Sequence, residues 1–192
     1  VVDNKNRFRI QCNHTATHLL QQALKNILGN HVEQKGSRVS SENFRFDFSH
    51  YSKLDQSDII SVENFVNSRI DNSIDLIEER NVPLKKSQDN GAIGLFGEKY
   101  GDTVRTIKFG ASYELCGGTH VNNTSELWQF KIISEGAIAS GIRRIEAITN
   151  ESVKNYYNSK INEYDKIKDL LKNPKSLYES VKSLFDENSL LK

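Results

Sequence analysis

The sequence has no methionine and only two prolines, two cysteines and one tryptophan among its 192 residues. It also lacks any stretch approaching the roughly 18 consecutive apolar residues of a membrane span. The first ten residues contain no apolar core of a secretory signal peptide. These absences indicate a cytoplasmic protein with no membrane partner, and the missing methionine suggests a fragment of a longer chain.

Charge of either sign is not in excess, because 26 Lys and Arg stand against 25 Asp and Glu, giving a net charge of +1. Without a global positive field the chain has no general affinity for nucleic acid. DNA is therefore not an expected partner, and any RNA contact must use a local patch. In a reducing cytoplasm, a cysteine beside histidines is more often a ligand or a nucleophile than half of a disulfide. Of Cys12 and Cys116, we predict a ligand role for Cys116 only.

Apolar periodicity predicts an N-terminal helix over residues 13–29, with Asn13 as its N-cap and Gly29 as its C-terminal stop. Two strands are predicted next, at residues 32–40 and 43–49. In the second strand Phe44, Phe46 and Phe48 alternate with polar residues, which indicates a half-buried hairpin arm.

The remaining elements follow from the same patterns. A helix is predicted at residues 55–72, an extended stretch at 74–79 that stops before Pro83, and a short helix after that proline. A loop with four glycines at 91–102 precedes strands at 104–109, 128–134 and 142–148. From residue 150 onward the pattern predicts a helical tail, so we expect a main domain at residues 1–150 and a tail or connector at 151–192.

Four residues have the spacing of a metal site. His14 and His18 lie one helical turn apart, so both imidazoles can point at one ion. Cys116 and His120 have the same spacing, but the glycine pair between them predicts a tight turn after a strand. One thiolate and three imidazoles suit zinc, which takes both sulfur and nitrogen ligands. We therefore predict that these four side chains hold one Zn²⁺ ion.

Each pair alone has an ordinary explanation, as two solvated histidines or as a plain turn with a buried thiol. Together they use four of the six His and Cys side chains other than His31, which makes a coincidence a poor explanation. Thr15 follows His14 where a metalloprotease of the HExxH type has its glutamate base, so that class is excluded. The spacing leaves open whether the zinc is structural, with four protein ligands, or catalytic, with one open position.

Six sequence blocks resemble the editing domain of alanyl-tRNA synthetases. They are HTATHLL, HVEQKGSRV, FRFDFSH, GLFGEKYGD, ELCGGTHV and GIRRIEAIT. The blocks occur in the order of that family and cover about residues 7–150. The threonyl-tRNA synthetase editing domain shares the histidine pair, but its cysteine motif reads differently and the FGEKYGD block is absent, so it is a more distant resemblance.

The resemblance implies an α+β fold: a mixed or antiparallel sheet packed with helices, a zinc site between an N-terminal helix and a strand-turn, and a C-terminal helical tail. It also implies an esterase that hydrolyses serine or glycine wrongly attached to the alanine tRNA. The residues that match the family's metal ligands are His14, His18, Cys116 and His120. The expected partners are the acceptor end of that tRNA and the remainder of the synthetase chain, which would carry aminoacylation and its ATP site.

For the reaction, Thr15 and Gln34 are candidates for polar contacts to the serine hydroxyl or the ester. The backbone N–H groups of Gly117 and Gly118 are candidates for holding a developing oxyanion. For both side chains, an ordinary surface polar residue is the alternative.

For the RNA, the candidate phosphate contacts are Arg143, Arg144, Lys99 and Arg105. The two neighbouring arginines alternate along a strand, so only one of them can face the RNA. Solvated strand charges are the alternative. Two rival interpretations of the whole chain also stay open: a zinc-stabilised RNA-binding module without turnover, and a free-standing trans-editing protein.

Overall fold

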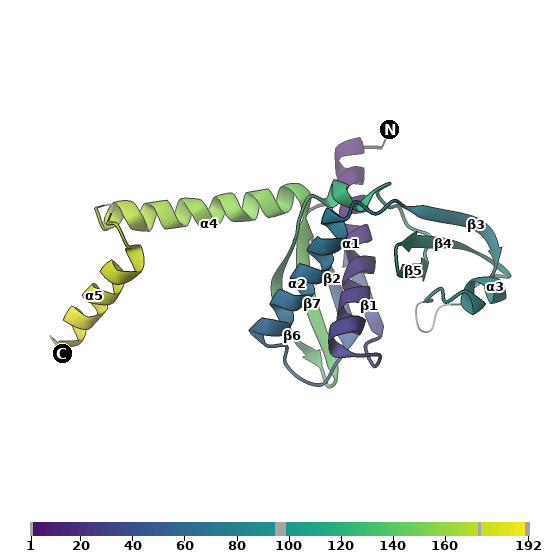
Figure 1. The fold of residues 1–192 in the computed structure, drawn as a ribbon, viewed down its shortest axis with the longest axis horizontal. Helices are drawn as coiled ribbons and strands as arrows, with labels where there is room; N and C mark the ends of the chain where they lie inside the picture. The colour runs from purple at the N-terminus through teal and green to yellow at the C-terminus, as the bar shows by residue number, and fades with distance from the viewer. Residues whose placement is uncertain (1, 95–98, 173, 191–192) are drawn as a thin grey trace. The chain divides into compact units, whose positions relative to one another are not determined.

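The computed structural model describes residues 2–94, 99–172 and 174–190. Its contacts divide the chain into two units, Val1–Val153 and Lys154–Lys192, which are described separately. The first unit contains two antiparallel sheets and most of the helices (Figure 1). The predicted α+β class is therefore confirmed.

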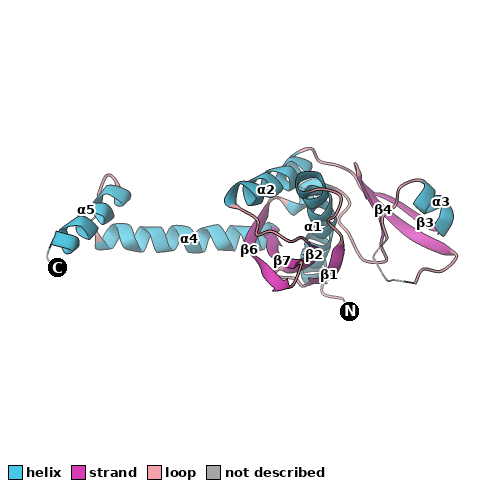
Figure 2. Ribbon diagram, turned by 90° about the horizontal axis from the view of Figure 1, so that it is seen from below, coloured by secondary structure: helices cyan, strands magenta, loops and turns pink. Residues whose placement is uncertain are grey.

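The larger sheet has four strands in the order β1 (Gln34–Val39), β2 (Phe44–Ser49), β7 (Ile142–Thr149) and β6 (Phe130–Ala139), all antiparallel. Helices α1 (Asn4–Leu28) and α2 (Gln56–Asp71) lie over one face of it (Figure 2). The three alternating phenylalanines of β2 are fully buried in the core between the sheet and these helices, as the alternation predicts. From α1, the core receives Leu19, Leu20 and Leu24.

Helix α1 starts at Asn4, nine residues before the predicted start at Asn13. The predicted N-cap at Asn13 is therefore wrong. The cap is Asp3, whose carboxylate accepts hydrogen bonds from the backbone N–H groups of Lys5 and Asn6. Asn13 instead uses its side chain in tertiary contacts, donating to the Ser40 carbonyl and accepting from the Thr149 hydroxyl. Gly29 ends the helix as predicted, with a φ of 114° that suits glycine.

The second sheet has three strands, in the order β3 (Ile77–Pro83), β4 (Thr103–Phe109) and β5 (Ser112–Leu115). The extended stretch predicted at 74–79 is thus displaced, because the strand runs on to Pro83 through a bulge between Glu79 and Val82. The short helix after Pro83 is confirmed as α3 (Leu84–Asp89). Of the predicted glycine loop at 91–102, residues 95–98, with Gly97, lie outside the described residues.

Helix α1 contacts β5 as well as the strands of the larger sheet. One side of α1 therefore lies against β5 of the second sheet (Figure 1). A short 3-10 helix, η1 (Thr124–Leu127), then leads from the second sheet back to β6.

The C-terminal part is helical, as predicted, with α4 (Asn150–Leu170) and α5 (Leu177–Leu190). The first turn of α4 belongs to the first unit, where Glu151 forms an ion pair with Arg9. Large apolar side chains of the second unit are exposed, among them Leu170, Phe185 and Leu190. Within the described ranges, no helix combines the length and apolar character needed to cross a membrane.

Candidate metal centre

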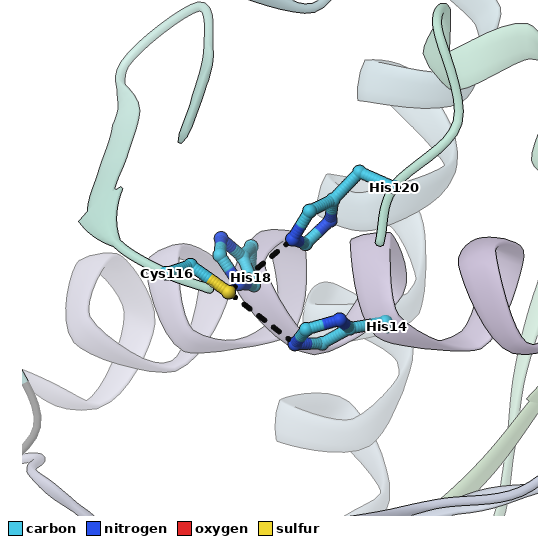
Figure 3. Close-up of side chains that lie close together, drawn as sticks. All are labelled: His14, His18, Cys116 and His120. Carbon is cyan, nitrogen blue, oxygen red and sulfur yellow. Dashed lines mark hydrogen bonds between the residues drawn. The ribbon is translucent and has the colours of Figure 1, made fainter. Parts of the chain in front are cut away.

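The four predicted ligands come together in space. One donor atom from each of His14, His18, Cys116 and His120 lies within 4.8 Å of the others. The two histidines of α1 and the pair from the segment after β5 point toward one another (Figure 3). The thiol Sγ of Cys116 lies 3.6 Å from Nε2 of His14 and 3.3 Å from Nε2 of His120.

Gly118 makes this approach possible. A Cβ atom at this position would lie 2.0 Å from Cε1 and 2.5 Å from Nδ1 of the His14 ring, so any larger residue collides with the ligand. At Gly117 a Cβ atom would meet nothing within 4 Å. Of the two glycines, only the second is required by packing against the site.

His14 and His120 are each held through Nδ1 by a group from the opposite half of the site, whereas Nδ1 of His18 faces a carboxyl group without a hydrogen bond. Nδ1 of His14 lies 3.2 Å from the Thr119 carbonyl, and Nδ1 of His120 lies 3.1 Å from the Thr15 hydroxyl. Nδ1 of His18 lies 3.4 Å from the Glu114 carboxyl group. These contacts leave Nε2 as the nitrogen that each ring can offer to a shared ion, an arrangement that commonly orients metal-binding histidines.

Burial keeps the three rings uncharged. It lowers the pKa of His14 and of His120, and lowers that of His18 to about 3. The neighbouring histidines and the Arg105 charge add to the effect at His18 and His120. At neutral pH these imidazoles therefore carry a free lone pair, which metal binding requires.

The donor types and two of the donor distances are those of a metal site. With Zn–S near 2.3 Å and Zn–N near 2.05 Å, adjacent ligand atoms of a tetrahedron are about 3.6 Å apart for sulfur and nitrogen. The two measured sulfur–nitrogen distances, 3.6 and 3.3 Å, lie close to that value. The cluster can therefore bind a metal ion.

Thr15 and Gln34 lie in different environments. The Thr15 side chain is fully buried, and its hydroxyl also accepts a hydrogen bond from the Val121 backbone N–H at 3.3 Å. Gln34 is half-buried on β1 and donates to the Ser37 hydroxyl at 3.1 Å. The two predicted substrate contacts thus differ, because Thr15 already holds a ligand and Gln34 lies nearer the surface.

The Gly118 N–H is directed at the site, since it donates to the Cys116 sulfur at 3.4 Å. Hydrogen bonding to sulfur favours the thiolate form, which is the form that binds metal. This use competes with the oxyanion role predicted for the Gly118 amide.

Three of the four predicted RNA-binding cations form ion pairs within the protein. Arg143 pairs with Glu135 in a buried pair, and Arg144 makes two hydrogen bonds to Asp47, at 2.6 and 2.8 Å. Arg105 bonds to Glu78 through Nε at 2.9 Å and Nη2 at 3.0 Å.

Lys99 is exposed. It lines a cavity beside the Cys116–Thr119 turn. A cavity of about 340 Å³ is bordered by Lys99, Tyr100 and Cys116, among others. A second cavity, of about 390 Å³, is bordered by Arg80, Arg105 and the backbone of the turn. Cationic side chains therefore line the space next to the proposed ligands.

Sequence reasoning missed the residues around the ligands, above all Glu114 and Glu78. Glu114 carried a usable signal, because it precedes Cys116 by two residues and side chains two apart along a strand share a face. Burial raises the pKa of Glu114 to about 8, so in the metal-free protein the group is largely uncharged beside His18. Glu78 carried no such signal, since only the pairing of β3 with β4 brings it near the site.

Comparison with known proteins gives a consistent result. Residues 104–146, which include Cys116 and His120, match the family "Threonyl and Alanyl tRNA synthetase second additional domain". An alanine–tRNA ligase of Flavobacterium psychrophilum is 55% identical over 180 residues, covering 94% of this chain and 20% of the relative.

Two further relatives with the same name come from Christiangramia forsetii, at 54% identity, and Bacteroides fragilis, at 46%. Each of these matches covers 100% of this chain and 22% of the relative. The chain therefore spans about a fifth of the length of the relatives that it matches.

Proposed function

Since residues 104–146 match the model of the threonyl and alanyl tRNA synthetase second additional domain and the chain is similar to a segment of alanine–tRNA ligases, we propose that it is the unit that hydrolyses wrong amino acids from the alanine tRNA. The substrates would be tRNA charged with serine or glycine. The hydrolytic unit would be residues 1–150, and residues 151–192 would connect it to the rest of the synthetase.

A hydrolytic unit is needed because a binding pocket alone discriminates poorly between small amino acids. A pocket sized for alanine cannot strongly exclude glycine, nor serine, which only adds a hydroxyl group, because one such group changes binding by about 1–3 kcal/mol. A second site must supply the remaining discrimination. A site that hydrogen-bonds a hydroxyl binds serine in preference to alanine. Gln34 is our candidate for that contact, and Thr15, whose buried hydroxyl lies on His120, would act through this ligand.

The observation that carries the proposal is the cluster of one thiol and three neutral imidazoles, whose donor atoms lie within 4.8 Å beside two cavities lined by cations. The ligands we propose are His14, His18, Cys116 and His120, with zinc as the ion. Bound there, zinc would supply a positive charge that attracts the ester or the terminal ribose.

The protein groups would then have separate tasks. The cavities would receive the acceptor end, with Lys99 near its phosphates, because an exposed cation at a cavity rim attracts a nucleic acid backbone. The backbone N–H of Gly117 is the remaining candidate for holding the developing oxyanion. The Gly118 N–H would hold the Cys116 sulfur.

The test supplies the chain with alanine tRNA carrying serine, glycine or alanine, and measures release of each amino acid. Release of serine and glycine, with alanine retained, would support the proposal. A Cys116→Ala variant, which loses one ligand, should bind the same tRNA without releasing serine. Tight binding by the unaltered, zinc-loaded protein with no release would instead identify an RNA-binding module with a structural metal.

A further inference from the structure

The guanidinium of Arg105 spans the space between a carboxylate and the turn that carries the Cys116 ligand. Its Nη1 donates to the backbone carbonyl of Cys116 at 3.0 Å and also to the carbonyl of Gly118. Its other side bonds to both carboxylate oxygens of Glu78, through Nε and Nη2. One side chain of β4 thus contacts two of the three residues at the start of the turn.

The turn needs such support because its own residues offer little. Gly117 and Gly118 have no side chains, and a Cβ at Gly117 would find no neighbour within 4 Å. Consecutive glycines also leave the backbone with more conformational freedom than any other residue pair. Two carbonyl groups fixed by one rigid, planar guanidinium restrict that freedom.

Glu78 in turn fixes Arg105. The two parallel N–H···O bonds set the plane of the guanidinium, and only about a fifth of the Arg105 side chain is exposed. Hydrogen bonds from Arg105 and Arg80 lower the pKa of Glu78 to about 2, so this carboxylate stays charged at neutral pH. The chain of contacts runs from β3 through β4 to the backbone of the ligand turn.

We propose that Arg105, held by Glu78, is a positioning residue that sets the place of the Cys116 sulfur in the metal centre. The inference rests on the metal site of the proposed function and deepens it. It also revises the RNA role predicted for Arg105, because its hydrogen bonds run to the protein itself.

The experiment titrates the metal-free protein with Co²⁺, which replaces zinc and gives a thiolate-to-metal charge-transfer band only when Cys116 binds it. In Arg105→Lys the charge remains but the planar fork is lost. We expect its Co²⁺ affinity to fall about 10- to 100-fold, the usual cost of removing a group that orients metal ligands. The charge-transfer band should also be weaker or shifted at full occupancy, which a loss of stability alone would not cause.

Arg80→Gln is the matched control. It also removes a guanidinium from Glu78, but Arg80 is 73% exposed, and its affinity and band should stay those of the unaltered protein. If Arg105→Lys fails to fold, Glu78→Gln tests the same positioning role, because it leaves Arg105 in place but weakens its support. Its Co²⁺ affinity and charge-transfer band should change in the same direction.

The outcomes separate this inference from the proposed function. If the unaltered protein binds Co²⁺ with the charge-transfer band and the Arg105 and Glu78 variants match it in affinity and spectrum, the positioning role is wrong and the metal site stands. If the unaltered protein gives no such band, the metal site fails and the positioning role fails with it.

Discussion

Replacing Gly118 with alanine is the most direct test of the site's packing. The added methyl group would start 2.0 Å from Cε1 of His14, whereas non-bonded carbons need about 3.5 Å, so the ring or the turn must move by about 1.5 Å. Metal–ligand distances tolerate only about 0.2 Å. We therefore expect Gly118→Ala to weaken zinc binding by at least the roughly 10- to 100-fold seen when ligand orientation is disturbed.

Gly117→Ala is the neighbouring control. A Cβ there meets nothing within 4 Å, and Gly117 is not among the described glycines with a positive φ, so alanine fits both the space and the backbone. The assay is competition for zinc against a chromophoric chelator, with circular dichroism of each metal-free variant to show that the helices and sheets persist. The alanine at 117 should bind zinc like the unaltered protein.

Equal zinc affinity of the two alanine variants would refute the reasoning. It would mean that the His14 ring does not rest on the turn when the ion is bound. A Gly118→Ala protein that has lost its secondary structure would instead point to a role of the turn in folding, which the core around α1 does not suggest.

The remaining predictions concern the ligands and their surroundings. Cys116→Ala should lose zinc and hydrolysis but keep its circular dichroism spectrum, and unfolding of this variant would argue for a structural metal. Glu114→Gln should lower zinc affinity about tenfold, measured by chelator competition, because the amide cannot ionise as the Glu114 carboxyl group, 3.4 Å from Nδ1 of His18, would beside a bound cation. Burial lowers the pKa of His14, His18 and His120 in the folded protein, so below about pH 6.5 the unfolded metal-free chain binds more protons than the folded one. The free energy of unfolding, measured by urea denaturation, should therefore fall as the pH falls from about 6.5 toward 5. Burial of Glu114 acts with the opposite sign, since its raised pKa adds stability as the pH falls below about 8, so Glu114→Gln should steepen the loss.

The fold could be predicted where one face of an element is apolar. The alternating phenylalanines predicted β2, and the apolar stripe predicted α1 from residue 13 to its end at Gly29. The first turns of α1 were missed because residues 4–11 are mostly polar, and the Asp3 cap lies outside any apolar periodicity. Strand β5 has four residues, which is too short for a period to be seen, and it was recognised only as a strand before the cysteine turn.

The ligands could be predicted for a different reason. A histidine or cysteine can bind metal whatever the fold, and two such residues four positions apart can point at one ion. The prediction therefore needs only that the fold brings the two pairs together. The supporting groups are not encoded in this way. In the sequence, Arg105 cannot be distinguished from any other cation of a strand. Its proposed positioning role depends on the antiparallel pairing of β3 with β4, which places Glu78 beside it.

The contacts around the ligands also bear on whether the metal holds the fold together. His14 is anchored by the turn and His120 by Thr15 of α1, so both contacts join the helix to the segment after the second sheet. Structural zinc is essential in small domains that fold only when metal binds. Here the phenylalanines of β2 and the leucines of α1 belong to an extensive buried core, which also includes Ile107 and Phe109 of β4. Protein contacts thus join the two halves of the site, so we expect a variant that has lost the metal, such as Cys116→Ala, to keep its fold.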